Sequence, residues 1–243
     1  MKYSFNIFII IIFQYIYGQA IITGEKLSYK AGFRLITAGE STLELKTDTL
    51  NSDIVYHIKS IVKSNSFLDI FYKLRDEIDI WIDQNDFSLL KMKKNTRQGK
   101  YRDKKDFKIN YSNQYIENNN QIYFSKKVFD PISAIYFLRN QVLTIQNQFI
   151  LPMFNGRKLR EISLVVMNNE VIKVPAGEFD CILVAPSSLD GSKLLKNNGA
   201  MKIWFSNDSL KIPVRIEQET NIGTMLLELK SILRPGANLP LTK

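Results

Sequence analysis

Apolar and polar residues alternate along most of the chain after residue 20. Successive side chains of a β-strand point to opposite faces, so alternation with a period of two predicts strands that are buried on one face. The stretch 73–83, KLRDEIDIWID, places four apolar side chains on one face: Leu74, Ile78, Ile80 and Ile82. Asp76 interrupts this apolar face, and Trp81 lies on the opposite, polar face.

The same alternation predicts further short strands, separated by Asn, Ser and Gly turn residues such as Asn168-Asn169. They span residues 26–34, 42–50, 54–62, 87–93, 106–111, 122–124, 161–166, 170–174, 179–184, 200–205, 213–219 and 224–232. Strands spaced this closely favour antiparallel hairpins. We therefore predict a mainly β fold, an antiparallel meander that forms a curved open barrel or β-spiral.

Residues 130–141, DPISAIYFLRNQ, break the alternation and predict a helix. Asp130 can cap the free amides of the first turn, and Pro131 suits the first helical position. The segment is apolar around most of its circumference, which favours deep packing. We expect this helix to lie across the concave face of the sheet, with Arg139 as a partner for the carboxylate of Asp76, which is expected to be buried.

Residues 200–205 and 212–219 are expected to form a hairpin connected by Ser206-Asn207-Asp208-Ser209. Asp208 suits this connection because aspartate bonds to its own turn backbone. Pro213 has no N–H, so we expect it at the start or outer edge of a strand. Trp204 is expected to pack under the hairpin.

The N-terminus has the form of a secretory signal peptide. Lys2 precedes the apolar run 7–13, and small residues follow, with Ala20 as the expected cleavage position and Gly18 as the alternative. An uncleaved anchor helix remains the other reading. We therefore expect a signal peptide at 1–20, a single β-rich domain at 21–243 and a periplasmic location. No cysteine at the boundary offers a site for lipoprotein-type lipid attachment.

Composition narrows the chemistry further. The net charge of +9 could favour anionic partners, but most lysines are interspersed with acids and amides, which is typical of a solvated surface. The cluster between Lys91 and Lys105 is expected at strand ends around a turn. The chain has no phosphate-binding Gly-rich loop, so no cofactor is expected. Nucleic acid is not expected either, because the sequence shows no nucleic-acid-binding motif and an exported protein rarely meets nucleic acid.

The sequence offers few combinations of side chains that could form a catalytic or zinc site. His57 and Cys181 are the only residues of their types, which argues against a zinc site. They could pair as a nucleophile and base, but Cys181 lies in an alternating strand where an inert buried thiol is usual. No Gly-x-Ser-x-Gly sequence is present. Carboxylates such as Asp76 and Asp208 could serve a hydrolase.

Apolar surface on the concave face is the remaining candidate site. Four aromatic residues are expected to line it as ligand-binding residues, unless they simply form the core: Trp81, Tyr136, Phe137 and Trp204. Asp76, Asp130, Arg139, Asp208 and Pro213 are expected to be structural.

Several short motifs occur in a fixed order: GEKLSY at 24–29, AG at 38–39, YKLRD at 72–76, QGKY at 98–101, DPISAIYFLR at 130–139, VPAGEFDC at 174–181 and IWFSNDSLKIPV at 203–214. Together they resemble DUF3108, a family of bacterial exported proteins of unknown function; Gln98 replaces the acid usual there. The hairpin at 203–214 is similar to that of periplasmic lipoprotein carriers of the LolA and LolB type. The DUF1849 envelope proteins have a similar spiral sheet. These resemblances imply a curved open β fold and an envelope setting, and no reaction.

Two functions follow as hypotheses. The first is a non-enzymatic periplasmic envelope protein that binds a lipid, lipoprotein, glycolipid or protein partner on its curved sheet and is at most peripheral to the membrane. The alternative is a carboxylate-dependent hydrolase acting on cell-wall or polysaccharide material. A purely structural envelope scaffold is the third possibility.

Overall fold

A single antiparallel sheet organises the protein in the computed structural model, which describes residues 21–33, 36–117, 121–188, 201–220 and 223–235. The expected signal peptide lies outside these residues. The strands are β1 (Lys26–Phe33), β2 (Ile36–Leu50), β3 (Asp53–Ser64), β4 (Arg75–Ile82), β5 (Leu89–Gln98), β6 (Tyr101–Asn110), β7 (Tyr115–Glu117), β8 (Ile122–Tyr123), β9 (Gln148–Phe154), β10 (Leu159–Val174), β11 (Gly177–Ser188), β12 (Met201–Ser206), β13 (Pro213–Thr220) and β14 (Gly223–Leu233).

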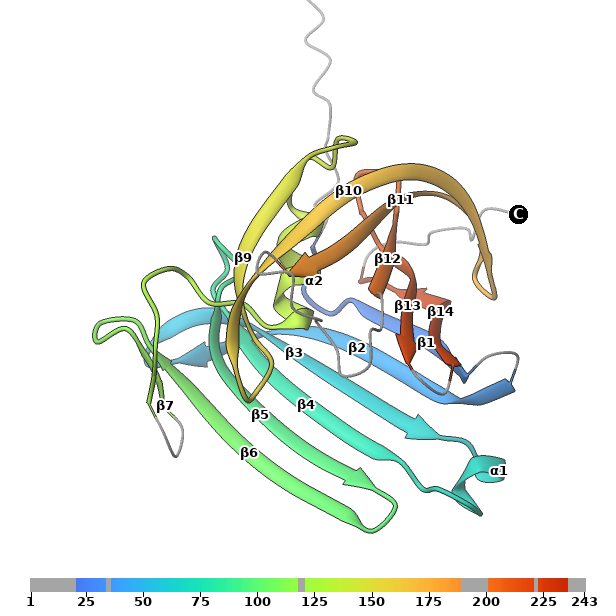
Figure 1. Cartoon of the computed structure of the whole chain (residues 1–243), viewed down its shortest axis with the longest axis horizontal. Coiled ribbons are helices and arrows are strands. Elements are labelled where there is room, and N and C mark those ends of the chain that lie inside the picture. Colours follow the sequence, from blue (N-terminus) through green and yellow to red (C-terminus); the bar gives the residue numbers. More distant parts are fainter. Residues whose placement is uncertain (1–20, 34–35, 118–120, 189–200, 221–222, 236–243) are drawn as a thin grey trace, which may run out of the picture.

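The strand order is β8-β7-β6-β5-β4-β3-β2-β1-β14-β13-β12-β11-β10-β9. Two meanders, β1 to β8 and β9 to β14, are thus joined by the pairing of β1 with β14, in which Lys26 lies opposite Leu233. The two meanders curl toward each other around a helix (Figure 1). The predicted fold class, a curved open antiparallel meander with a helix on its concave side, is confirmed.

The sheet stays open because its edge strands β8 and β9 do not pair. The segment before the helix spans the gap instead. The amide of Leu89 on β5 donates to the carbonyl of Val128 at 2.7 Å, and Phe129 exchanges backbone hydrogen bonds of 2.9 and 2.7 Å with Pro152 and Phe154 of β9. An extended segment therefore links β5 to β9 by backbone hydrogen bonds, while the sheet itself remains open.

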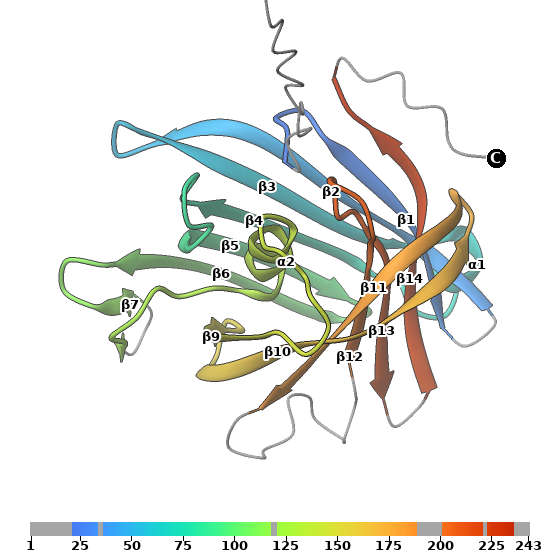
Figure 2. The same cartoon turned by 90° about the horizontal axis from the view of Figure 1, so that it is seen from above.

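The helix α2 (Pro131–Arg139) is capped by Asp130 and has Pro131 as its first residue, as predicted, but it ends at Arg139, two residues before the end of the predicted segment 130–141. The Asp130 carboxylate accepts from the amides of Ile132 and Ser133, and the Ser133 hydroxyl accepts from the Asp130 amide. This reciprocal capping satisfies donors that would otherwise be buried without partners. Seen from above, α2 lies between the two meanders (Figure 2).

Two hydrophobic cores form on opposite faces of β12. Phe205 belongs to the core around α2, whereas its neighbour Trp204 belongs to a second core with Tyr29, Cys181 and Val214. The second core is covered by the far end of the β10–β11 hairpin, where the Ala176 amide donates to the Leu229 carbonyl of β14 at 2.9 Å. Alternation within one strand therefore supplies both cores.

Four elements differ from the prediction, and several strands have other bounds, such as β5 (89–98) and β6 (101–110), predicted at 87–93 and 106–111. Residues 161–174 form one strand, β10, with a bulge between Val166 and Asn169 in place of the predicted turn. Strand β7 and strand β9 were not predicted. Strand β9 contains Pro152, which a sheet edge tolerates because no ladder N–H is needed there. A short helix, α1 (Ser66–Asp69), connects β3 to β4.

Candidate functional site

An apolar pocket lies between α2 and the second meander. Its floor is made by Ala134, Ile135 and Leu138 of α2, which face Phe154, Ile162 and Ile203. These side chains are buried because each points from its strand or helix toward the core around α2. The cavity has a volume of about 150 Å³. A cavity of about this size and apolar lining accepts a benzene-sized group, so the pocket could take the end of a hydrocarbon chain.

The rim of this pocket is polar and cationic on one side. Asn155 and Lys158, from the turn between β9 and β10, are exposed, and Arg160 at the start of β10 is half-buried. Gly156 in that turn has a φ of 86°, which favours glycine. Apolar walls beside a cationic rim are suited to an amphipathic anion.

A buried ion pair holds the helix that forms the floor. Arg139 donates to both oxygens of Glu25, at 2.6 and 2.9 Å, and its Nε donates to the Leu210 carbonyl at 3.2 Å. Burial alone would lower the pKa of Arg139, but the Glu25 carboxylate outweighs burial and raises it. Arg234 lies 3.4 Å from the same carboxylate. The helix is thereby fixed to residues just before β1 and just after β14.

The expected partnership of Arg139 with Asp76 is wrong. Asp76 lies on β4 and accepts from the Arg97 amide at 3.0 Å and from the Gln98 side chain at 2.5 Å. Asp76 shares a face of β4 with Ile78, Ile80 and Ile82, as expected, but it is half-buried and not buried, so it needs no ionic partner from α2. The side-chain amide of Gln98 donates to a carboxylate that an acid at this position would repel.

The four candidate ligand residues occupy three different environments, and none lines the apolar pocket. Tyr136 is a residue of α2 whose side chain is buried in the core, and burial raises the pKa of its hydroxyl. Phe137 packs edge-on against Phe129 and Phe149, with ring centroids at 5.3 and 6.0 Å. These rings hold the helix against β9.

Trp81 and Trp204 do not line the concave face, which corrects the expectation from sequence. Trp81 alternates with the buried Ile80 and Ile82 and therefore lies on the outer face, where it stacks on His57 at 4.6 Å and donates to Asp48 at 2.7 Å. Trp204 is 4% exposed and belongs to the second core, under the β12–β13 hairpin as predicted.

The hairpin residues take the positions expected for them. Asp208 accepts from the amides of Leu210 and Lys211 at 2.9 and 3.0 Å, and Pro213 is the first residue of β13. The Pro213 carbonyl accepts from the Tyr29 hydroxyl at 2.9 Å. Pro213 therefore starts a strand and anchors it to β1.

The polar residues weighed for catalysis lie apart. His57 bonds to Asp79 at 2.8 Å on the outer face, whereas Cys181 lies in the second core. Burial, with smaller effects of nearby carboxylates, raises the pKa of the Cys181 thiol to about 12. Within the described residues no group of three or more His, Cys, Asp or Glu side chains is arranged to hold a metal ion.

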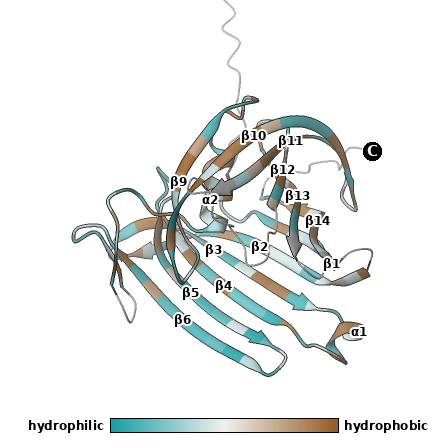
Figure 3. Ribbon diagram, viewed as in Figure 1, coloured by the Kyte–Doolittle hydropathy of each residue, from teal (hydrophilic) through white to brown (hydrophobic). Residues whose placement is uncertain are grey.

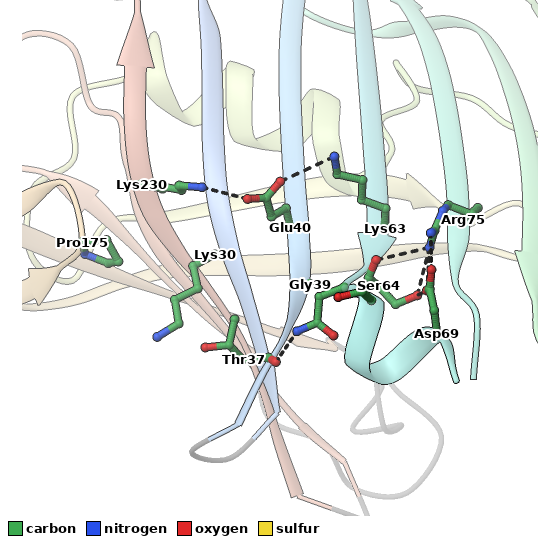
Figure 4. Close-up of a pocket in the computed structure, with 12 residues that line it drawn as sticks. Lys30, Thr37, Gly39, Glu40, Lys63, Ser64, Asp69, Arg75, Pro175 and Lys230 are labelled. Carbon is green, nitrogen blue, oxygen red and sulfur yellow. Dashed lines mark hydrogen bonds and ion pairs between the residues drawn. The ribbon is translucent and has the colours of Figure 1, made fainter. Parts of the chain in front are cut away.

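A larger, charged cleft of about 590 Å³ lies where β2 begins and β3 ends (Figure 4). Glu40 lies between Lys230 and Lys63, at 2.7 and 3.5 Å, and Asp69 pairs with Arg75 at 2.5 Å. The bond from Lys230 is the main cause of the lowered pKa of Glu40. Because both carboxylates of this cleft are paired with cations of its own lining and the cleft lies open to water, we regard the apolar pocket as the better candidate for a ligand.

Sequence reasoning missed the strand residues of the pocket. Met153 and Phe154 lie on the unpredicted strand β9, and Ile162 and Ile203 were assigned to strands without a partner for their apolar faces. The apolar run FILPMF was the available signal, but periodicity alone does not separate such a run from a buried helix.

Comparison with known proteins identifies the family. The family model described as protein of unknown function (DUF3108) matches residues 27–230. The match covers most of the chain, so the protein belongs to DUF3108. Among curated proteins, none matches it.

One of the similar solved structures shares the fold at low sequence identity. A beta-barrel-like protein of the DUF1849 domain from Brucella abortus is 10% identical, with a TM-score of 0.57 over 87% of this chain and 98% of that one. A protein described as exported, with a YmcC-like fold, from Bacteroides fragilis is 11% identical, with a TM-score of 0.38 over 88% and 97%. The DUF1849 likeness supports the fold and nothing further.

Proposed function

We propose that this protein is a non-enzymatic cell-envelope protein that binds the apolar end of an amphipathic, anionic molecule such as a lipid in the pocket beside α2. The observation that carries the proposal is the juxtaposition of an apolar cavity with Lys158 and Arg160 on its rim. Ligand sites of this class are mostly apolar with a few oriented polar groups.

The size of the cavity restricts the ligand. About 150 Å³ accommodates a short part of a hydrocarbon chain and not a whole diacyl lipid. The ligand would therefore insert a chain end and leave its head group at the rim. The helix α2 is suited to form one wall because its capping and its buried ion pair with Glu25 fix it before any ligand arrives.

Binding is favoured over hydrolysis by the surroundings of the candidate carboxylates. Asp76 on β4 accepts a hydrogen bond from the Arg97 amide of β5, and Asp208 accepts from amides in the turn before β13. They lie on different elements and each is committed to a backbone amide. The envelope location rests on the secretory character of residues 1–20.

Native mass spectrometry of the full chain, purified from a bacterial host without detergent, is the first test. Adducts of lipid mass are expected. The delipidated protein should then bind palmitate more tightly than hexadecanol, because only palmitate offers a carboxylate to the cationic rim. A clean apo mass together with no palmitate binding would overturn the proposal.

Variants locate the binding in the pocket. Ala134→Leu fills the cavity from α2 and is expected to weaken palmitate binding by about tenfold or more, the effect of losing roughly two buried methylenes. Ala31→Leu on the half-buried surface of β1 is the matched control. Lys158→Glu should remove the preference for palmitate over hexadecanol, whereas Lys173→Glu, exposed on β10, should not.

A further inference from the structure

The connection between β3 and β4 exposes an unusual group of large apolar side chains. Phe67, Ile70 and Phe71 are 62, 75 and 73% exposed, and Tyr72 beside them is also exposed. The rings of Phe67 and Phe71 contact each other edge-on, with centroids 5.8 Å apart, so the group is contiguous. We call residues 67–72 the apolar tip. Exposed apolar groups of this kind mark interaction surfaces more often than chance.

The tip is built to be presented outward. Asn65 caps α1 by accepting from Leu68, and its own amide and side chain donate to Ala38 and Thr37 of β2 at 2.9 and 2.8 Å. Asp69 is fixed from below by Arg75 and Ser64. The polar side of the segment therefore lines the charged cleft of Figure 4, and its apolar side faces away from the body.

The tip occupies one extremity of the molecule. It lies at the far end of β3 and β4, away from α2 (Figure 1), and stands out as an apolar segment at the end of largely hydrophilic strands (Figure 3). The turn between β5 and β6 lies beside it, since the Gly99 amide donates to the Lys73 carbonyl at 2.9 Å. The Tyr72 ring lies against Gly99 of that turn, and Tyr101, the first residue of β6, is also exposed.

Cations surround the tip in excess. The two segments that form this end, residues 63–76 and 97–102, carry six Lys and Arg side chains: Lys63, Lys73, Arg75, Arg97, Lys100 and Arg102. They carry two carboxylates, Asp69 and Asp76, and both are engaged in the hydrogen bonds described above. Lys63 and Arg75 pair with Glu40 and Asp69, so the positive excess at this end is carried by Lys73, Arg97, Lys100 and Arg102.

We propose that the apolar tip docks on an anionic lipid bilayer, with Phe67, Ile70 and Phe71 entering the head-group layer and the surrounding Lys and Arg side chains facing acidic head groups. Peripheral proteins commonly bind membranes by this combination of apolar burial and attraction to anionic lipid. An acidic bilayer matches the charge of this end, whereas a second copy would oppose like charges. The docking surface is separate from the pocket beside α2 and does not rest on the function proposed for it.

Co-sedimentation of the full chain with lipid vesicles tests the proposal. Binding is expected to vesicles that contain phosphatidylglycerol and to be much weaker with phosphatidylcholine alone. Raising the salt from about 0.1 M to about 1 M should weaken binding, because the Debye length falls from about 10 Å to about 3 Å. The double variant Ile70→Ser/Phe71→Ser should lose about tenfold or more in vesicle affinity.

A matched control removes two largely exposed apolar side chains elsewhere. Ile54 at the start of β3 and Val171 on β10 are each 64% exposed, and Ile54→Ser/Val171→Ser should leave binding unchanged. Brominated lipid should quench the fluorescence of the tryptophan introduced by Phe71→Trp, whereas the fluorescence of the tryptophan introduced by Ile54→Trp should not be quenched. Equal loss in both double variants, absence of vesicle binding, or a dimer that only the tip variant dissociates would overturn the proposal.

Discussion

Arg139 of α2 and Glu25, the residue before β1, form a doubly hydrogen-bonded ion pair in which both side chains are buried. Arg234, just beyond β14, approaches the same carboxylate at 3.4 Å. The helix is therefore joined to the seam where the first and last strands of the sheet meet. This contact, rather than strand pairing alone, holds the two meanders around the helix.

Removing the Glu25 carboxylate should strongly lower the free energy of unfolding. Glu25→Ala would remove the carboxylate that the buried guanidinium groups of Arg139 and Arg234 face, and breaking a buried ion pair costs about 3–5 kcal/mol. Urea unfolding followed by circular dichroism measures this loss. Glu77→Ala, which breaks the half-exposed pair with Lys59, should cost about 1 kcal/mol or less. Similar losses in the two variants would contradict the structural role of Glu25.

Replacing each of the two tryptophans by alanine should lower the stability of the protein by very different amounts. Trp204→Ala removes a buried ring from the second core and is expected to cost about 3–5 kcal/mol. Trp81→Ala removes a half-buried ring that stacks on His57, and a loss of about 1 kcal/mol is expected. Chemical denaturation of both variants checks the difference. A small effect at Trp204 would place its ring outside the core.

Two glycines of neighbouring strands test a close backbone contact. A Cβ on Gly39 would lie 2.0 Å from the Lys63 carbonyl oxygen of β3, so Gly39→Ala must displace backbone. A Cβ on Gly32 would meet its nearest atom at 3.4 Å. We expect Gly39→Ala to lose at least about 1–3 kcal/mol, in the range of overpacked cores, and Gly32→Ala to change little. Thermal unfolding of both proteins is the measurement, and equal midpoints would count against this packing.

Cys181 should be unreactive in the folded protein. Burial raises the pKa of its thiol to about 12, above the value near 8.5 expected in the unfolded chain. The stabilisation from the protonated thiol is therefore complete below about pH 8.5 and is lost as the pH rises through about 12. Iodoacetamide should label the native protein slowly at pH values between about 8 and 10, and rapidly in urea. Fast native labelling would show an accessible thiolate.

The sequence by itself determined the class of fold and much of its local chemistry. Alternation marked most strands because half-buried strands must alternate. Asp130 and Asp208 accept from nearby backbone amides, and Pro131 and Pro213 are the first residues of α2 and β13. Family membership also followed from the order of short motifs, which the match over residues 27–230 bears out.

The tertiary structure decided which faces meet. Alternation places Trp204 and Phe205 on opposite faces, but only the curl of the β10–β11 hairpin shows that both faces of β12 are buried. The choice of Glu25 over Asp76 as the partner of Arg139 depends on contact across 114 residues of chain. The pocket beside α2 likewise needs walls from separate elements. Local pattern carries no information on such pairings, because they arise from the register and curvature of the whole sheet.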